Sequence, residues 1–280
     1  PIYGDRDIDG AVVDPADLDE CNGLESPTPE FPDGVYHYVL LEVMTEQSTV
    51  RCLHGKLDKP LEIPAYIDYD LWCGPAEKRE LYRPKFHYDW HWDFNTGNGD
   101  MGNQGIHQMD IARWFLGEKQ LSPKIMSIGG RLGYEDAGDT PNTQVVYHDY
   151  AAAPLIFETR GLPQREMDYK LGMDNYRGSQ VGVIVQCEQG YVVIPSYSNA
   201  AAFDNDCKEI QSWKGSGNHF VNFLNAVRSR KREDLNADIL EGHLSSALCH
   251  TGSITHRLGQ KMNAAQAAEA VKSNANFSDS

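Results

Sequence analysis

Positive charge is scarce in this chain. It has 25 lysines and arginines against 41 aspartates and glutamates, which gives a formal net charge of -16 over 280 residues. A surface of this sign repels phosphate backbones and anionic lipid headgroups. The composition argues against nucleic-acid and membrane partners, and it favours a neutral or cationic small molecule or another protein.

Several targeting and cross-linking signals are missing as well. No apolar run reaches the roughly 18 residues of a membrane-spanning helix, and the N-terminal PIYGDRDIDG lacks the basic-then-apolar pattern of a signal peptide. The six cysteines show no CxxC spacing, which favours free, buried thiols over a disulfide framework. These features predict a soluble protein of a reducing compartment, with the cytoplasm favoured.

Common catalytic signatures are also absent. The sequence contains neither the GxSxG nucleophile elbow nor a P-loop, so hydrolase and NTPase motifs do not explain it. The hydrophobic content of 40% is ordinary for a folded protein. Length alone allows one large domain or two small ones.

Chemistry-bearing residues concentrate in one segment, Phe86 to Asp110. If its first part is extended, side chains alternate between two faces. One face would hydrogen-bond, bind metal or relay protons, and the other would stack on a sugar or pack in the core. The polar face would hold His87, Asp89, His91 and Asp93, and the apolar face Tyr88, Trp90, Trp92 and Phe94. Such a polar face also arises by alternation alone, so we predict no metal site.

The second part of this segment predicts a helix from about Asn103 to Gly117. Asn103, His107, Asp110 and Trp114 would form one stripe of that helix. His107 is a candidate general acid or base, since an imidazole titrates near neutrality, and Asp110 would orient it. A purely structural histidine–aspartate pair is the alternative.

A glycine-rich loop, Gly97 to Gly102, could fold the two polar faces toward one pocket. The predicted catalytic residues are His107, Asp110 and His91. The predicted substrate-binding residues are His87, Trp90, Trp92, Asn103 and Gln104. For the two tryptophans, packing in the core is the alternative.

The order of elements predicts an α+β fold. Strand-like runs between about residues 124 and 198 follow one another without intervening helices, which indicates an open, mostly antiparallel sheet. Helices at 219–229 and about 236–258 would pack on one face of it. The first 54 residues, with strand-like runs at 7–13, 35–43 and 48–53, form an N-terminal extension. Residues 263–280 form a frayed tail.

Five segments in order resemble one family: IDYDLWCGP, FHYDWHWDF, GDMGNQGIHQMDIARWFLG, GYEDAGDTPNTQ and EGHLSSALCH. They are similar to the carboxy-terminal α/β domain of the Gfo/Idh/MocA sugar oxidoreductases, over residues 55–262. The resemblance implies an NAD(P)-binding Rossmann domain followed by an α/β domain whose open sheet carries substrate contacts and subunit interfaces. It therefore implies a homo-oligomer assembled through that sheet.

The chain differs from this family in the motifs that bind and serve the cofactor. A Rossmann domain needs a glycine-rich turn between a strand and a helix, and the clusters at Gly129–Gly133 and Gly97–Gly105 are interpreted as turns within the α/β domain. The family's EKP motif is missing, and its DxxxH pair falls on Asn103 and His107. We therefore expect no NAD(P) binding by this chain alone, with residues 1–54 a candidate remnant of a nucleotide domain.

Three functions remain open at this point. The chain is the substrate half of a sugar oxidoreductase whose NAD(P) comes from another domain or chain. Alternatively, it is a cofactor-independent glycosidase or lyase that uses His107 for acid–base chemistry. The third possibility is a sugar-binding or assembly subunit without catalytic activity.

Overall fold

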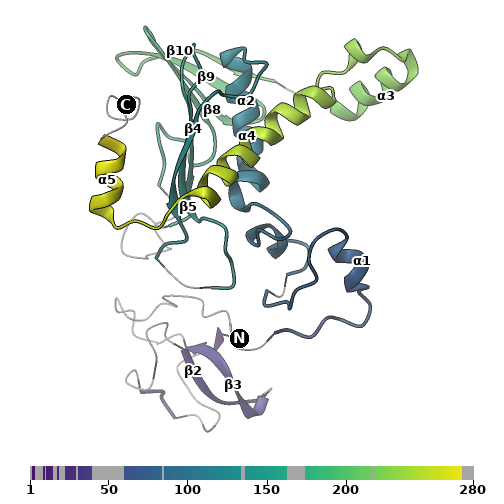
Figure 1. Ribbon diagram of the computed structural model, residues 1–280, viewed down its shortest axis with the longest axis vertical. Coiled ribbons are helices and arrows are strands. Elements are labelled where there is room, and N and C mark those ends of the chain that lie inside the picture. The colour runs from purple at the N-terminus through teal and green to yellow at the C-terminus, as the bar shows by residue number, and fades with distance from the viewer. Residues whose placement is uncertain are drawn as a thin grey trace.

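The computed structural model describes residues 2–3, 9, 11–14, 18, 23–29, 31–39, 60–83, 85–133, 136–162, 174–215 and 217–272. Within these ranges the chain forms five α-helices and three open sheets (Figure 1). All strand pairs described are antiparallel except β1 with β3. The predicted α+β class is confirmed.

The central sheet contains three antiparallel strands in the order β4-β5-β6. These strands are β4 (Ile125–Gly130), β5 (Thr143–His148) and β6 (Leu155–Arg160). The middle strand carries the fully buried Val146 and His148, which alternate with residues of the other face as a pleated strand requires. The strand-like runs of the sequence predict all three strands.

Two helices cover this sheet and close the main core (Figure 1). They are α2 (Ile106–Leu116) and α4 (Ile239–Leu258). Met101, Met109 and Leu248 pack with Val146, each at most 2% exposed. A Cβ on Gly252 of α4 would lie 3.2 Å from Val146 Cγ1, so the absence of a side chain there lets the helix approach the sheet closely.

The second sheet is a four-stranded meander in the order β10-β9-β8-β7. Its strands are β7 (Val183–Cys187), β8 (Gly190–Ser196), β9 (Asn199–Asp204) and β10 (Glu209–Lys214). The turn between β8 and β9 contains Tyr197 and Ser198. α2 also contacts β6 and β7, so it lies between strands of both sheets.

The remaining helices are α1 (Tyr69–Cys73), α3 (His219–Ser229) and α5 (Ala264–Lys272). α3 has the predicted bounds, and α4 begins three residues after the predicted start because Asp238 caps it by accepting from the Leu240 and Glu241 N–H groups. The alanine-rich segment that the sequence predicts to fray contains α5, since alanine has the highest helix propensity. Residues 273–280 lie outside the described residues.

The segment around His91 differs from its prediction. Residues 89–92 form a short 3-10 helix, η2 (Asp89–Trp92), rather than an extended strand. The Tyr88 and Asp89 N–H groups both donate to the Lys85 carbonyl, at 2.9 and 2.8 Å, and the Asp89 carboxylate accepts from the Lys85 N–H at 3.1 Å. These local bonds favour a turn over a strand, so the alternating two-faced arrangement does not form.

The N-terminal sheet contains β1 (Ile2–Tyr3), β2 (Gly23–Thr28) and β3 (Phe31–Val39). β3 begins four residues before the strand predicted at 35–43. The strand predicted at 48–53 lies outside the described residues, as do residues 7, 8 and 10 of the strand predicted at 7–13. No helix in the described ranges is long and apolar enough to span a membrane.

Candidate functional site

His107 lies one residue into α2 and is exposed to solvent. A wide π-type helical turn, η3 (Met101–Gly105), precedes the helix, and such turns are frequent at functional sites. The His107 ring meets the ring of Tyr197 edge-on, with centroids 5.2 Å apart. Gln104 donates to the Tyr197 hydroxyl at 2.7 Å. Two segments more than 90 residues apart in the chain therefore bring an imidazole, an amide and a phenol together at the surface.

Asp110 does not orient His107 through a hydrogen bond. Its carboxylate accepts from Arg113 Nη2 at 3.1 Å and from the Ser245 hydroxyl. Arg113 is 3% exposed and also bonds Glu241 of α4 and, at 2.9 Å, the Glu118 carbonyl. Burial would lower the pKa of Arg113, but the two carboxylates outweigh it and raise that pKa. This network fastens α2 to α4 and thereby fixes the helix that presents His107.

His91 is buried, with 1% of its surface exposed. Its Nδ1 bonds the Tyr88 carbonyl, and its Nε2 has no hydrogen-bond partner among the described residues, with Asp100 Oδ1 3.7 Å away. The ring packs against Trp92, with centroids 4.1 Å apart. His91 and His107 therefore have different surroundings, and a shared catalytic role for them stays a prediction.

The other predicted binding residues are spread over this region. His87 is exposed, Trp90 is 40% exposed and Trp92 is half-buried beneath the Arg83 guanidinium, 4.7 Å from the ring centre. Asn103 and Gln104 are half-buried in η3. Only Gln104 among these residues joins the cluster formed by His107 and Tyr197.

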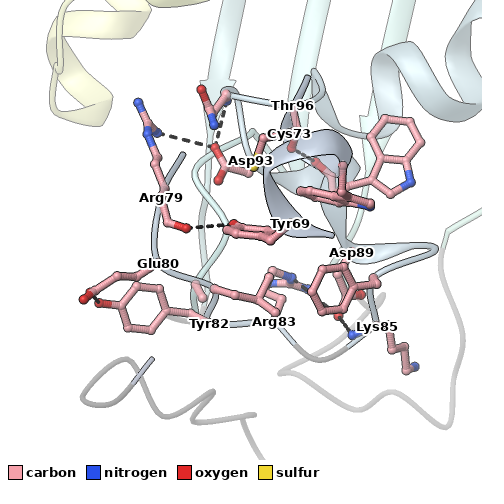
Figure 2. Close-up of a pocket in the computed structure, with 16 residues that line it drawn as sticks. Tyr69, Cys73, Arg79, Glu80, Tyr82, Arg83, Lys85, Asp89, Asp93 and Thr96 are labelled. Carbon is pink, nitrogen blue, oxygen red and sulfur yellow. Dashed lines mark hydrogen bonds and ion pairs between the residues drawn. The ribbon is translucent and has the colours of Figure 1, made fainter. Parts of the chain in front are cut away.

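A separate cavity of about 60 Å³ lies beside α1 (Figure 2). Tyr69, Trp72 and Phe86 form its aromatic wall, with ring centroids 5.3 to 6.1 Å apart. Trp90 lines it, together with Asp89 and Asp93, whereas His91 and His107 do not. The volume suits a few water molecules, so the surface at His107 is the better candidate for a sugar.

Gly97, Gly99 and Gly102 have the GxGxxG spacing of a dinucleotide-binding loop. The loop follows the turn of η2 rather than a strand. The Gly97 N–H donates to the Asp93 carbonyl at 2.7 Å, and a Cβ there would lie 2.5 Å from His91 Cα. These glycines serve close packing and a turn, and the loop does not fit a bound dinucleotide.

Sequence reasoning missed Tyr197, Arg113 and Ser245. Tyr197 stands in a hairpin turn, PSYSN, with no local feature that distinguishes it from other turn residues. Arg113 and Ser245 lie in separate helices and meet only after α2 packs on α4. An arginine within the apolar part of a helix was the single available signal.

Comparison with known proteins identifies two segments. Residues 51–174 match the C-terminal alpha/beta domain of the Gfo/Idh/MocA oxidoreductase family, which confirms the predicted resemblance over the first part of residues 55–262. Residues 4–55 match the model named YHYH protein. Among curated proteins, none matches the chain.

Three solved structures show a distant similarity to this chain. The WlbA dehydrogenase from Bordetella pertussis, in complex with NADH and UDP-GlcNAcA, is 16% identical with a TM-score of 0.40, and the match covers 64% of this chain and 50% of that one. A Klebsiella pneumoniae oxidoreductase is 14% identical with a TM-score of 0.43, and the match covers 59% of this chain and 48% of that one. The UDP-N-acetylglucosamine 3-dehydrogenase from Acidithiobacillus ferrooxidans is 10% identical with a TM-score of 0.30, and the match covers 54% of this chain and 44% of that one.

The match spans about half the length of each of these structures. The family model covers residues 51–174, and the described residues of this range have an α+β architecture. This part of the chain is therefore similar to the C-terminal alpha/beta domain of the Gfo/Idh/MocA oxidoreductases.

Proposed function

We propose that this chain is the substrate-binding half of a carbohydrate-acting oxidoreductase. Residues 55–262 form the substrate unit, and residues 1–54 form a separate N-terminal element. The nicotinamide cofactor is bound by another domain or chain. The substrate is a neutral sugar, and the copies assemble through the open sheet face.

The observation that carries this proposal is the cluster of His107, Gln104 and Tyr197. All three side chains present polar atoms at the surface, and they come from a helix start and a hairpin turn. A structural histidine of a helix face is usually satisfied by a neighbouring carboxylate, but Asp110, one turn further along the helix, is engaged by Arg113 and Ser245. An exposed imidazole beside two hydrogen-bonding groups suits recognition of a sugar hydroxyl.

His107 supplies the proton chemistry in this proposal. Oxidation of a sugar alcohol removes a proton from oxygen and a hydride from carbon, and no amino-acid side chain accepts a hydride. The imidazole accepts the proton of the hydroxyl, while Gln104 and Tyr197 hold that hydroxyl or its neighbour. Because Arg113 fastens α2 to α4, the imidazole is held on a rigid element.

The test is calorimetric binding of a panel of free sugars and nucleotide sugars to the purified chain. We expect His107→Ala and Gln104→Ala each to weaken binding of the preferred sugar. His250→Ala is the matched control, because His250 is an exposed histidine on α4. The melting temperature should stay unchanged in His107→Ala and His250→Ala, since exposed substitutions seldom alter stability by more than about 0.5 kcal/mol.

Turnover separates the proposed chemistry from its alternatives. With the missing cofactor domain supplied, His107→Ala should reduce sugar oxidation about a hundredfold or more, the scale of general acid–base catalysis. Micromolar affinity of this chain alone for NAD or NADP would contradict the proposal that another domain or chain binds the cofactor. Sugar cleavage without nicotinamide would instead favour a glycosidase or lyase.

A further inference from the structure

Helix α3 is amphipathic, and its apolar face points to solvent. Its apolar side chains recur at the i, i+3, i+4 and i+7 spacing of one helix face, and this face is exposed. Phe220 is 69% exposed, Phe223 59%, Leu224 48% and Val227 40%. A face of this kind normally points into a core.

The side of α3 that carries Asn222 and Ala226 is the one that is covered. Asn222 donates to the Asp234 carbonyl at 2.7 Å and accepts from the Asn236 N–H at 3.1 Å, and Ala226 is buried. These contacts fasten α3 to the connection that leads into α4, including the short helix η5 (Arg232–Asp234). Figure 1 shows α3 beyond the N-terminal end of α4, away from both large sheets. The helix therefore cannot rotate to bury its apolar face without losing this docking.

The exposed area is large enough for a specific interface. With ordinary side-chain areas, the four apolar residues and Val221, 48% exposed, present on the order of 500 Å². Ile239 and Leu240, exposed at the adjacent start of α4, bring this toward roughly 800 Å², the area that each partner contributes to a standard protein interface. Monomeric proteins seldom leave such a patch in water.

Charges beside the patch indicate which partner fits. The last turn of α3 and the connection after it expose three cations, Arg228, Arg230 and Lys231, followed by two exposed carboxylates, Glu233 and Asp234. None of the ion pairs within the described residues involves these five side chains, whereas Arg232 pairs with Asp238 at 2.7 Å. Both signs lie on one short segment, which makes the surface complementary to itself under a two-fold rotation. A net charge of -16 disfavours an anionic lipid surface as the occupant.

We propose that the apolar face of α3 binds a second copy of this chain through a two-fold interface. The α3 helices of the two subunits pack together, and the cations of one connection meet the carboxylates of the other. This contact is distinct from assembly through the sheet face, and it does not depend on the function of His107.

Sedimentation of the full chain at micromolar concentrations tests the proposal. We expect Phe223→Glu to raise the dissociation constant at least about thirtyfold, as expected for loss of an aromatic anchor. At concentrations where both chains are monomeric, its melting temperature should not fall below that of the native chain, because Phe223 is already 59% exposed. Ile156→Glu is the matched control, since Ile156 is 48% exposed on β6 of the central sheet, and it should leave the α3 contact intact.

Cross-linking gives a second, independent measurement. Under mild oxidation Leu224→Cys should form a covalent dimer, because this position faces the partner subunit. Asn225→Cys, on the other side of the same exposed helix, should not. Native cysteines are common to both variants and therefore cancel in the comparison.

Three outcomes would overturn the proposal. One is a native chain that stays monomeric throughout. Another is association that survives Phe223→Glu but disappears in Ile156→Glu. The third is a native monomer that binds vesicles of anionic phospholipid through α3, which would assign this face to a lipid surface.

Discussion

Replacing His148 by leucine should make the folded protein less sensitive to acid. His148 ends β5 and is fully buried, and neither ring nitrogen has a hydrogen-bond partner among the described residues. Its ring stacks on Tyr150, with centroids 6.5 Å apart. An imidazole in this setting is neutral, because charging it would place an unpaired cation in the core.

The magnitude follows from the shift in pKa. Burial lowers the pKa of His148 from 6.5 to about 4. Because the folded pKa lies below the unfolded one, the unfolded chain takes up a proton first as the pH falls. Above pH 6.5 both states are neutral and the histidine has no effect. Between pH 7 and pH 5 the native protein should lose about 2 kcal/mol through this residue, and the loss is complete below pH 4.

Urea unfolding monitored by circular dichroism at pH 7, 6 and 5 measures this effect. His148→Leu introduces an apolar side chain of similar size and removes the titrating group. Its stability relative to the native chain should rise by about 2 kcal/mol from pH 7 to pH 5. His243→Leu, at an exposed position of α4, is the control for replacing a surface histidine by leucine.

Parallel loss of stability in the native chain and His148→Leu between pH 7 and pH 5 would refute the reasoning. It would mean that His148 is protonated in the folded state or contacts solvent. At pH 7 His148→Leu should be equal to or more stable than the native chain, because an unpartnered buried polar group costs about 1 to 3 kcal/mol.

Three further predictions test how the elements of the fold pack together. Arg113→Ala should destabilise the fold by about 2 to 4 kcal/mol in urea unfolding, because it leaves two carboxylates without their buried cation; a loss below about 0.5 kcal/mol would show that the network does not hold α2 on α4. Gly97→Ala should also destabilise by about 2 kcal/mol or more, since its Cβ would lie 2.5 Å from a backbone atom of His91. Gly242→Ala, at a helical position with nothing within 4 Å, should instead stabilise by about 0.5 to 1 kcal/mol, and equal effects of the two glycine changes would contradict the packing. Finally, burial raises the pKa of Cys249 to about 12, so mass spectrometry after brief thiol labelling at pH 8 should find exposed Cys187 modified and Cys249 unmodified; labelling of Cys249 at a similar rate would show that this part of the core opens.

Local pattern determined most of the secondary structure. The strand-like runs between residues 124 and 198 are rich in β-branched and aromatic residues and are separated by glycine, proline and asparagine, and each became a strand. The helix ending at Gly117 ends there because glycine accepts a φ of +68° at the C-cap. Each of these signals lies within a few neighbouring residues, so it can be recognised from the sequence alone.

The segment around His91 shows where local pattern was misleading. Polar and aromatic residues alternate from His87 to Phe94, as in a strand, yet hydrogen bonds to the Lys85 backbone form a turn there. Alternation reports a strand only when a neighbouring strand is available for pairing. Within the described residues no strand pairs with this segment.

Contacts between distant residues were decided by the tertiary structure alone. Asp110 lies one turn from His107 on the same helix, which made the two a natural pair, but Arg113 and Ser245 engage its carboxylate once α4 packs against α2. Tyr197 meets His107 only because the β8–β9 turn folds over the start of α2. The sequence by itself therefore determined the fold class and the helices α2, α3 and α4, because these depend on local spacing. Which side chains surround His107, and which apolar helix face stays exposed, depends on packing between elements far apart in the chain, and no local spacing encodes it.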